Sequence, residues 1–235
     1  MSLLVTVLAR AGSRGLPGKA MKILRGKPLI AHTLDMAIKY GDVILSTNDE
    51  SVLDFVRDIV KYDGVCVQER SEELAKSTTP KMESIKDAIE FACMQNGKLY
   101  DTILDLDITA PLRTADDVDK CLDIFANGDF NTVFSVAKSR KSPDFNMVEM
   151  AADNPRYIRI SDVIRRQDTL YTYDMNASIY VYDVDWLLKD VTNRPVSARS
   201  KIYVMEDWQA FDIDTLVDFY IVETMMKKFM VKVKK

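Results

Sequence analysis

A buried strand that runs directly into a glycine-rich, cationic loop opens this chain and limits its possible folds more than any other segment. The apolar run 3–8 is followed by RAGSRGLPGK at residues 10–19, which holds three glycines, a proline and the cations Arg10, Arg14 and Lys19. Glycine permits backbone angles and close approaches that a side chain would forbid. Exposed backbone N–H groups together with these cations form a site for an anion. The loop therefore predicts a phosphate-bearing ligand at the end of the first strand.

The loop differs from both common phosphate-binding motifs. A P-loop has four residues between its glycines and then Lys followed by Ser or Thr, whereas five residues separate Gly12 from Gly18 here and Ala20 follows Lys19. The dinucleotide fingerprint is G-x-G-x-x-G, but this loop has the pattern G-x-x-G-x-x-G. We also expect the loop to continue beyond residue 21 and the first helix to begin only at Pro28, a favoured first-turn residue. The alternative interpretation is a basic surface loop with incidental glycines.

Length and composition indicate one large domain, or one domain with an appendage. The chain has 235 residues, of which 47% are apolar and 29% charged, enough for a full core and a charged surface. It has no apolar run long enough to cross a membrane and no signal-peptide pattern. Cys66, Cys93 and Cys121 are widely spaced, which is typical of buried free thiols in a reducing cytosol. We therefore expect a cytoplasmic protein without a membrane partner, and the net charge of −4 argues against nucleic-acid binding.

Strands and helices are expected to alternate through the first half of the chain. The patterns predict strands at 3–8, 42–46, 64–68, 102–106 and 131–136, and helices at 28–38, 50–61, 82–94 and 115–126. This order predicts an α/β fold with a mostly parallel sheet covered on both faces. Ligands of such folds bind at the carboxyl ends of the strands, where the opening loop, Asn48, Asp105, Asp107 and Arg113 are expected to lie.

Residues 138–175 interrupt this alternation. They are rich in Lys, Arg and Tyr and show little core periodicity. We interpret them as an excursion from a single domain of residues 1–235, serving as an oligomerisation arm or a lid. Strands at 177–183 and 201–205 and a final helix at about 215–229 are expected to complete the domain.

Two short carboxylate motifs are candidates for a metal or substrate site. Asp212 and Asp214 are alternate residues of an expected extended segment, so their side chains point the same way. Two carboxylates together with substrate phosphates are a usual way to hold Mg²⁺. The alternative is that Asp214 only caps the final helix. Asp105 and Asp107 form the second motif, for which metal binding, hydrogen bonding to substrate hydroxyls and helix capping all remain open.

Nucleophilic catalysis has little support in this sequence. There is no G-x-S-x-G motif and no Cys/His metal spacing, and we expect the only histidine, His32, to be structural. A basic glycine loop combined with carboxylate pairs favours phosphoryl or nucleotidyl transfer, in which the protein supplies positioning, cations and a metal.

Five motifs then occur in a familiar order. They are A-R-x-G-S-[KR]-G-L-P-x-K at 9–19, R-x-x-E-L-A at 70–75, P-L-R-T at 111–114, N-A-S-I-Y at 176–180 and D-I-D-T at 212–215. Over nearly the whole chain the sequence resembles the acylneuraminate cytidylyltransferases, which include the CMP-sialic acid synthetases and relatives acting on other nonulosonic acids. The resemblance implies a three-layer, Rossmann-like nucleotidyltransferase fold, and a homodimer in which the 138–175 segment embraces the partner.

The same resemblance implies a role for each candidate site residue. For the nucleotide it implies that Arg10 and Lys19 bind the triphosphate of CTP, with added backbone contacts from Ala11, Gly12 and Ser13. It also implies that Arg70 and the segment 75–81, which ends at Lys81, lie against the cytosine and ribose. For the acceptor and metal it implies that Asn176 and Arg166 face the sugar or the triphosphate and that Asp212 and Asp214 hold Mg²⁺. Asp107 is a further candidate for substrate binding, at a position where the sequence departs from the family. Arg10, Lys19, Asp212 and Asp214 would be the catalytic residues, because cations and Mg²⁺ neutralise the triphosphate while pyrophosphate leaves.

The sequence departs from the family on the sugar side. Residues 106–113 are LDITAPLR where sialic acid enzymes have L-Q-P-T-S-P-L-R, so Asp107 replaces a glutamine. A carboxylate cannot donate a hydrogen bond as an amide does, and it repels an anionic acceptor unless a cation intervenes. Asp174 replaces a common basic residue, and the segment 142–146 lacks a lysine that helps to hold the sugar carboxylate. We therefore expect a legionaminic-type or other modified nonulosonic acid as the acceptor.

The expected activity is transfer of CMP from CTP to the anomeric hydroxyl of a nonulosonic acid, giving a CMP-sugar for cell-surface polysaccharide synthesis and pyrophosphate. Three alternatives remain open: a nucleotidyltransferase for another sugar such as 3-deoxy-manno-octulosonate, a dinucleotide-dependent oxidoreductase, and a nucleotide-binding regulatory protein without catalysis.

Overall fold

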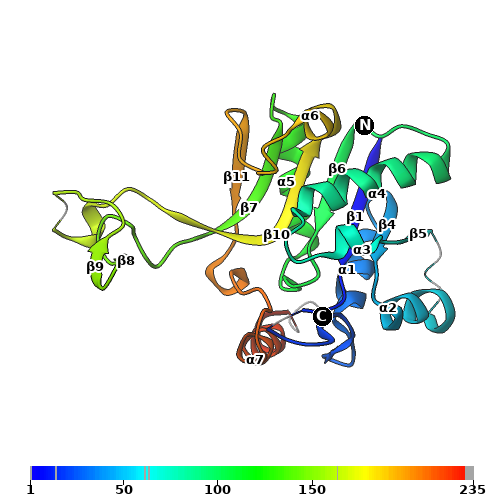
Figure 1. Cartoon of the computed structure of the whole chain (residues 1–235), viewed down its shortest axis with the longest axis horizontal. Helices are drawn as coiled ribbons and strands as arrows, with labels where there is room; N and C mark the ends of the chain where they lie inside the picture. The colour runs from blue at the N-terminus through cyan, green and yellow to red at the C-terminus, as the bar shows by residue number, and fades with distance from the viewer. Residues whose placement is uncertain (1, 14, 61, 63, 163, 231–235) are drawn as a thin grey trace.

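A seven-stranded sheet forms the centre of the protein in the computed structural model (Figure 1). The structure describes residues 2–13, 15–60, 62, 64–162 and 164–230, and only the backbone of residues 58–60 and 166. The strand order is β11-β7-β10-β6-β1-β4-β5. The strands span β1 (Leu3–Ala9), β4 (Asp42–Thr47), β5 (Val65–Glu69), β6 (Thr102–Leu106), β7 (Thr132–Lys138), β10 (Tyr173–Asp183) and β11 (Ser200–Val204).

The sheet is parallel except at β10, which runs antiparallel to both of its neighbours, β6 and β7. The expected mostly parallel α/β fold is therefore confirmed. The reversal follows from connectivity, since the chain leaves the sheet at the end of β7 and returns along β7 from that same end. Sequence pattern alone does not reveal this direction, because a buried strand has the same apolar character whichever way it runs.

Helices cover both faces of the sheet. One face packs against α1 (Leu29–Ala37), α2 (Glu50–Asp54) with its π-helical continuation η2 (Phe55–Val60), and α5 (Ala115–Ala126). The other face packs against α4 (Lys81–Asn96) and α6 (Val184–Lys189). The three-layer arrangement buries the strands on both sides, which explains their nearly continuous apolar sequences.

The helix starts follow the local sequence. Asp49 caps α2 by accepting from Ser51 N, as the sequence predicts. Thr114 caps α5 in a reciprocal capping box with Asp117, and α5 has the predicted bounds. Helix α1 begins at Leu29, directly after Pro28 as its N-cap. The patterns missed the short hairpin of β2 (Ile23–Leu24) and β3 (Lys27–Pro28), the single turn α3 (Glu72–Ala75), and α6.

A smaller cluster joins the opening loop to the end of the chain. Helix α7 (Leu216–Met225) and its continuation η5 (Met226–Met230) pack through Phe219, Val222 and Met226 against Leu16 and Leu24. This contact places the segment before α7 beside the opening loop. No helix within the described ranges is both long and apolar enough to span a membrane.

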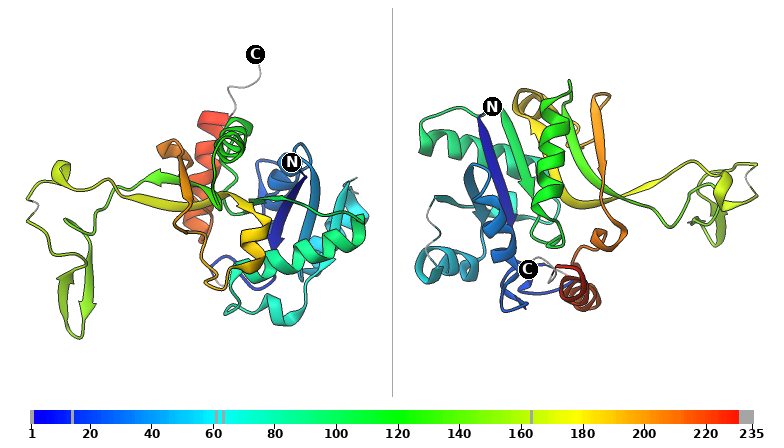
Figure 2. Two further views of the ribbon diagram at one scale, coloured as in Figure 1. Left: turned by 90° about the horizontal axis from the view of Figure 1, so that it is seen from above. Right: turned by 180° about the vertical axis from the view of Figure 1, so that it is seen from behind.

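The segment between β7 and β10 extends from the body as an arm. Figures 1 and 2 show it projecting away from the sheet in all three views, with the hairpin of β8 (Val148–Ala151) and β9 (Asn154–Tyr157) toward its end. A backbone bond from Ser139 N to Thr172 O closes its base. The arm leaves the sheet at the end of β7 and returns into β10, and both strands lie inside the sheet.

Candidate active site

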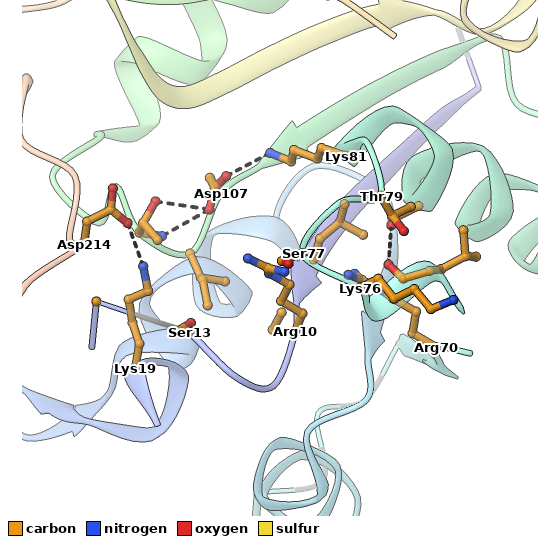
Figure 3. A pocket seen from close by; sticks show the side chains of 17 residues that line it. Arg10, Ser13, Lys19, Arg70, Lys76, Ser77, Thr79, Lys81, Asp107 and Asp214 are labelled. Carbon is orange, nitrogen blue, oxygen red and sulfur yellow. Dashed lines mark hydrogen bonds and ion pairs between the residues drawn. The ribbon is translucent and has the colours of Figure 1, made fainter. Parts of the chain in front are cut away.

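A cavity of about 450 Å³ lies at the carboxyl ends of the parallel strands, where the fold predicts a ligand (Figure 3). Four segments line it: the opening loop, the connection from β5 to α4, the end of β6, and the segment before α7. Their polar lining residues are Arg10, Ser13, Lys19, Arg70, Lys76, Ser77, Thr79, Lys81, Ser84, Asp107, Thr109 and Asp214. Most of the residues chosen from the sequence are therefore brought to one place.

Lys19 links the opening loop to the segment before α7. Its Nζ donates to the carbonyl oxygen of Ile213 at 2.6 Å and lies 3.0 Å from Oδ1 of Asp214. The Lys19 residue is 9% exposed, so its ammonium group needs these partners. The link joins residues that are 195 positions apart in the chain.

Gly15 makes the same junction possible through backbone contact. A Cβ atom at this position would lie 2.4 Å from the carbonyl oxygen of Asp214. Real Cβ atoms do not approach an oxygen this closely, so only glycine allows the loop to pack here. Gly12 and Gly18 serve differently, since they adopt the left-handed region with φ of 75° and 64°. The predicted use of glycine for both close approach and unusual backbone angles is confirmed.

The start of the opening loop is fixed by Asn48. Its Oδ1 accepts the backbone N–H of Ala11 at 2.8 Å. That N–H is therefore already hydrogen-bonded within the protein and is not available to a phosphate. Arg10 is exposed and lines the cavity together with Ser13. Arg14, one of the cations identified in the sequence, lies outside the described residues.

Arg70 contributes a buried cation to the cavity wall. Its Nε and Nη2 donate to Oγ and O of Ser46 at 3.1 and 2.8 Å. Burial lowers the pKa of Arg70 to about 10, against the opposing effect of the Asp87 carboxylate. The side chain therefore remains positively charged at neutral pH. Arg10, Lys76 and Lys19 also line the cavity, so this part of it suits a polyanion.

Lys81 is held by two carboxylates. Its Nζ lies 2.7 Å from Oδ2 of Asp105 and 2.9 Å from Oδ2 of Asp107. Figure 3 shows the Lys81 side chain directed at Asp107. Although burial alone would lower it, these two carboxylates raise the pKa of Lys81 well above its usual value. The cation that the sequence requires beside Asp107 is therefore Lys81.

Arg113 serves the fold. It is 2% exposed, and its guanidinium donates to Oγ1 of Thr33 and to the carbonyl oxygens of Ala110, Asp107 and Ser178. These bonds fix the turn after β6 that carries Asp107. His32 is also structural in its contacts, since its Nε2 lies 2.8 Å from the carbonyl oxygen of Leu24 and burial lowers its pKa.

Asp212 and Asp214 are not the cap of the last helix. Thr215 caps α7 in a capping box with Asp218, which leaves the carboxylates of Asp212 and Asp214 for another use. Burial and the charge of Asp214, with further repulsion from Asp107 and Asp218, raise the pKa of Asp212. Asp212 is partly buried and Asp214 is exposed. Two neighbouring carboxylates that repel each other are a suitable donor set for a hard divalent cation. Among the described residues, however, no group of three or more His, Cys, Asp or Glu is arranged to hold a metal.

Asn176 is not among the described residues that line the cavity. Asn176 is buried in β10, where its Oδ1 accepts from Ser135 Oγ at 2.7 Å and its Nδ2 lies 3.1 Å from Sδ of Met205. Arg166 belongs to a 3₁₀ turn (Arg166–Asp168) in the arm, and its side chain is outside the described part. Asp174 is exposed in β10 near the base of the arm. The binding roles of Asn176 and Arg166 stay predictions.

The sequence did not single out several lining residues. Lys76, Ser77 and Thr79 were included only as members of the segment 75–81, and Ser84 was not considered. Ser84 lies one helical turn after Lys81 on α4 and was identifiable by that spacing. Its Oγ donates to the carbonyl oxygen of Leu74, which joins α4 to the turn before it.

Replacing Gly15 by Ala tests the junction between the opening loop and Asp214. The added Cβ forces these backbones apart, so we expect CTP affinity, measured by isothermal titration calorimetry, to fall at least about tenfold. Gly26→Ala is the matched control, since Gly26 has φ of 89° but open space around a Cβ. It should lose stability through backbone strain and keep its CTP affinity. Unchanged CTP affinity in Gly15→Ala would contradict the role assigned to this contact.

Comparison with known proteins agrees with this geometry. The chain is 29% identical over 234 residues to the post-translational flagellin modification protein B of Campylobacter coli, covering 96% of this chain and 95% of the relative. It is 29% identical to the CMP-N,N′-diacetyllegionaminic acid synthase of Campylobacter jejuni, covering 94% and 93% of the two chains. The solved structure of a CMP:2-keto-3-deoxy-manno-octonic acid synthetase in complex with CTP matches with a TM-score of 0.65 at 16% identity, covering 97% and 99%. The match to the synthetase structure shows that the two proteins share a fold.

The family assignment rests on the sequence as a whole. The model of the cytidylyltransferase family matches residues 4–231, which include the opening loop, the cavity lining and the segment before α7. This match argues against the alternative of a dinucleotide-dependent oxidoreductase. The chain belongs to the cytidylyltransferase family.

Proposed function

We propose that this protein transfers CMP from CTP to the anomeric hydroxyl of a nonulosonic acid. The observation that carries the proposal is the cavity in which cations from the opening loop and the β5–α4 connection face the carboxylate-bearing segment before α7. The names of the relatives support this acceptor class, since one is a CMP-N,N′-diacetyllegionaminic acid synthase. The free cysteines Cys66, Cys93 and Cys121 fit work in the reducing cytoplasm.

We propose the following binding roles for the residues that line the cavity. Arg10, Arg70 and Lys76 attract the triphosphate, and Lys19 holds the Asp214 segment against the opening loop. The sugar hydroxyl oxygen forms a bond to the α-phosphorus and releases its proton to solvent, while the bond from the α-phosphorus to the bridging β-phosphate oxygen breaks and pyrophosphate leaves. The cations stabilise the charge that develops on the phosphate oxygens.

Asp212 and Asp214 are the residues that we propose to hold Mg²⁺. Their charge and spacing fit a cation that prefers oxygen ligands and keeps part of its coordination for phosphates. When bound, Mg²⁺ would supply positive charge to the phosphates during transfer. Lys19 donates to Asp214 at 3.0 Å, which orients this carboxylate within the cavity.

Pyrophosphate release tests the activity directly. Each of the four common nucleoside triphosphates is combined with N-acetylneuraminic acid, N,N′-diacetyllegionaminic acid, pseudaminic acid or 3-deoxy-manno-octulosonic acid in the presence of Mg²⁺. We expect release only with CTP and a nonulosonic acid together. Release with 3-deoxy-manno-octulosonic acid alone would reassign the acceptor, and no CTP-dependent release would reject the enzyme proposal.

Asp212→Asn tests the metal proposal. Because the pKa of Asp212 is higher in the folded state than in the unfolded state, ionisation of Asp212 lowers the free energy of unfolding. This destabilisation develops as pH rises from the unfolded-state pKa through the folded-state pKa. The substitution should therefore raise the melting temperature at pH 7 without metal, while Mg²⁺-dependent turnover falls about 100-fold.

Asp218→Asn is the matched control with the opposite sign. Burial alone would raise the pKa of Asp218, but hydrogen bonds from Thr215 and Asp214 lower it overall. Its ionised form therefore stabilises the fold above the unfolded pKa, and the stability is lost as pH falls through the folded one. Asp218→Asn should lower the melting temperature at pH 7. A lowered melting temperature in Asp212→Asn, or unchanged Mg²⁺ dependence, would contradict the metal assignment.

The arm is the surface that we propose for a homodimer. It exposes large apolar side chains to solvent, including Ile160 at 94% and Ile164 at 85% exposure. Exposed apolar groups on a projecting arm are typical of an interaction surface, and a second copy of the chain is the partner implied by the family resemblance.

Sedimentation velocity tests the dimer. The wild-type chain should sediment as a dimer, and the double variant Ile160→Asp/Ile164→Asp should sediment as a monomer because the charges prevent burial. Val191→Asp is the control, since Val191 is equally exposed at 88% but belongs to the body. A monomeric wild-type chain, or a double variant that stays dimeric, would reject this surface.

A further inference from the structure

The ammonium group of Lys81 is not free to bind phosphate. It bridges Asp105 and Asp107 and lies 5.3 Å from the ring centre of Tyr180. Lys81 is the first residue of α4, so its backbone belongs to the β5–α4 connection on the nucleotide side while its charge is directed at β6. The position of the residue in the chain and the position of its charge therefore point to different roles.

The two carboxylates are held in place independently of Lys81. Asp105 is fully buried, and its Oδ1 accepts from Oγ1 of Thr6 at 2.8 Å. Oδ1 of Asp107 accepts from N and Oγ1 of Thr109 at 3.3 and 3.2 Å. Neither carboxylate can turn away if the ammonium leaves. Withdrawal of Lys81 toward a phosphate would leave two negative charges close together in a poorly solvated place, which is strongly unfavourable.

Lys81, Asp105 and Asp107 taken together carry a net negative charge at the cavity wall, on which the buried Arg113 guanidinium also acts. One ammonium and two carboxylates sum to one net negative charge, and Asp107 lines the cavity. Although burial alone would raise it, the charge and hydrogen bond of Lys81 keep the pKa of Asp107 below its usual value. A nonulosonic acid is itself an anion, so any charge added here acts directly on its binding.

We propose that Lys81 is a positioning residue for the acceptor, which offsets one of the two negative charges of the Asp105–Asp107 pair so that Asp107 can face an anionic sugar. This role rests on the proposed function and replaces the nucleotide contact expected of Lys81 from the family resemblance. The ammonium acts through Asp107, and Arg10, Arg70 and Lys76 remain as the cations for the triphosphate.

Lys81→Met tests the proposal, because methionine keeps an unbranched apolar stem beside Tyr180 and removes the charge. With CTP and N,N′-diacetyllegionaminic acid as substrates, we expect the acceptor KM to rise at least about tenfold through added repulsion. The Kd for CTP alone, measured by calorimetry without acceptor, should change by less than about twofold. Lys76→Met is the contrasting variant, since Lys76 pairs with the exposed Glu73. It should weaken CTP binding and leave the acceptor KM nearly unchanged.

Two further variants separate charge from structure. Lys81→Arg restores the cation and should recover most of the acceptor KM. Lys81→Met/Asp107→Asn restores the original net charge, so its acceptor KM should be lower than that of Lys81→Met alone. The increase in acceptor KM caused by Lys81→Met should become smaller as the salt concentration is raised. Circular dichroism and melting curves check folding. If Lys81→Met does not fold, Lys81→Arg and the double variant carry the comparison.

The outcomes distinguish this role from the proposed function. A rise in the CTP Kd of Lys81→Met with unchanged acceptor KM would overturn the positioning role and make Lys81 a nucleotide ligand. An acceptor KM that is insensitive to salt and is not improved by Asp107→Asn would also overturn it. Absence of turnover in the wild-type enzyme with every acceptor would instead reject the proposed function, independently of any Lys81 variant.

Discussion

The contact between Lys19 and the Ile213–Asp214 segment is the interaction on which the candidate site depends. A nearly buried ammonium group requires polar partners, and here they come from the opposite end of the chain. Gly15 makes the contact close by leaving room for the carbonyl of Asp214. Packing of α7 against Leu16 and Leu24 supports the same junction from the apolar side. As a result, Arg10 and Lys19 of the opening loop and Asp214 before α7 line one cavity.

Charge in this cavity is divided by position. Arg10, Arg70 and Lys76 form a positive part that suits a triphosphate, whereas Lys81 is committed to the two carboxylates of β6. Arg113 was a candidate ligand in the sequence, but its guanidinium binds three carbonyl oxygens and a hydroxyl in the interior. Arg70, Lys81 and Arg113 therefore have three different roles. Arg70 lines the positive part of the cavity, Lys81 pairs with the carboxylates of β6, and Arg113 fixes the backbone of a turn.

The arm interrupts the alternation of strands and helices and sets the direction in which the chain returns to the sheet. The chain leaves the sheet after β7, forms the β8–β9 hairpin and returns as β10, the strand that runs against both neighbours. Its exposed isoleucines are unusual for a surface facing only water. None of the described residues that line the cavity belongs to the arm.

The local elements and the class of ligand follow from the amino-acid sequence alone. Apolar periodicity located the main strands and helices, glycine placement identified the opening loop as a candidate anion site, and the caps at Asp49 and Thr114 follow from residue type. These features depend on a few adjacent residues. Tertiary structure decided which charges pair: Lys19 with Asp214, Lys81 with Asp105 and Asp107, and Asn48 with the amide of Ala11. Such pairings form between groups that are far apart in the chain and come close only after folding. The energy of a charge depends on its burial and on its nearest partner. Spacing in the sequence gives information on neither of these.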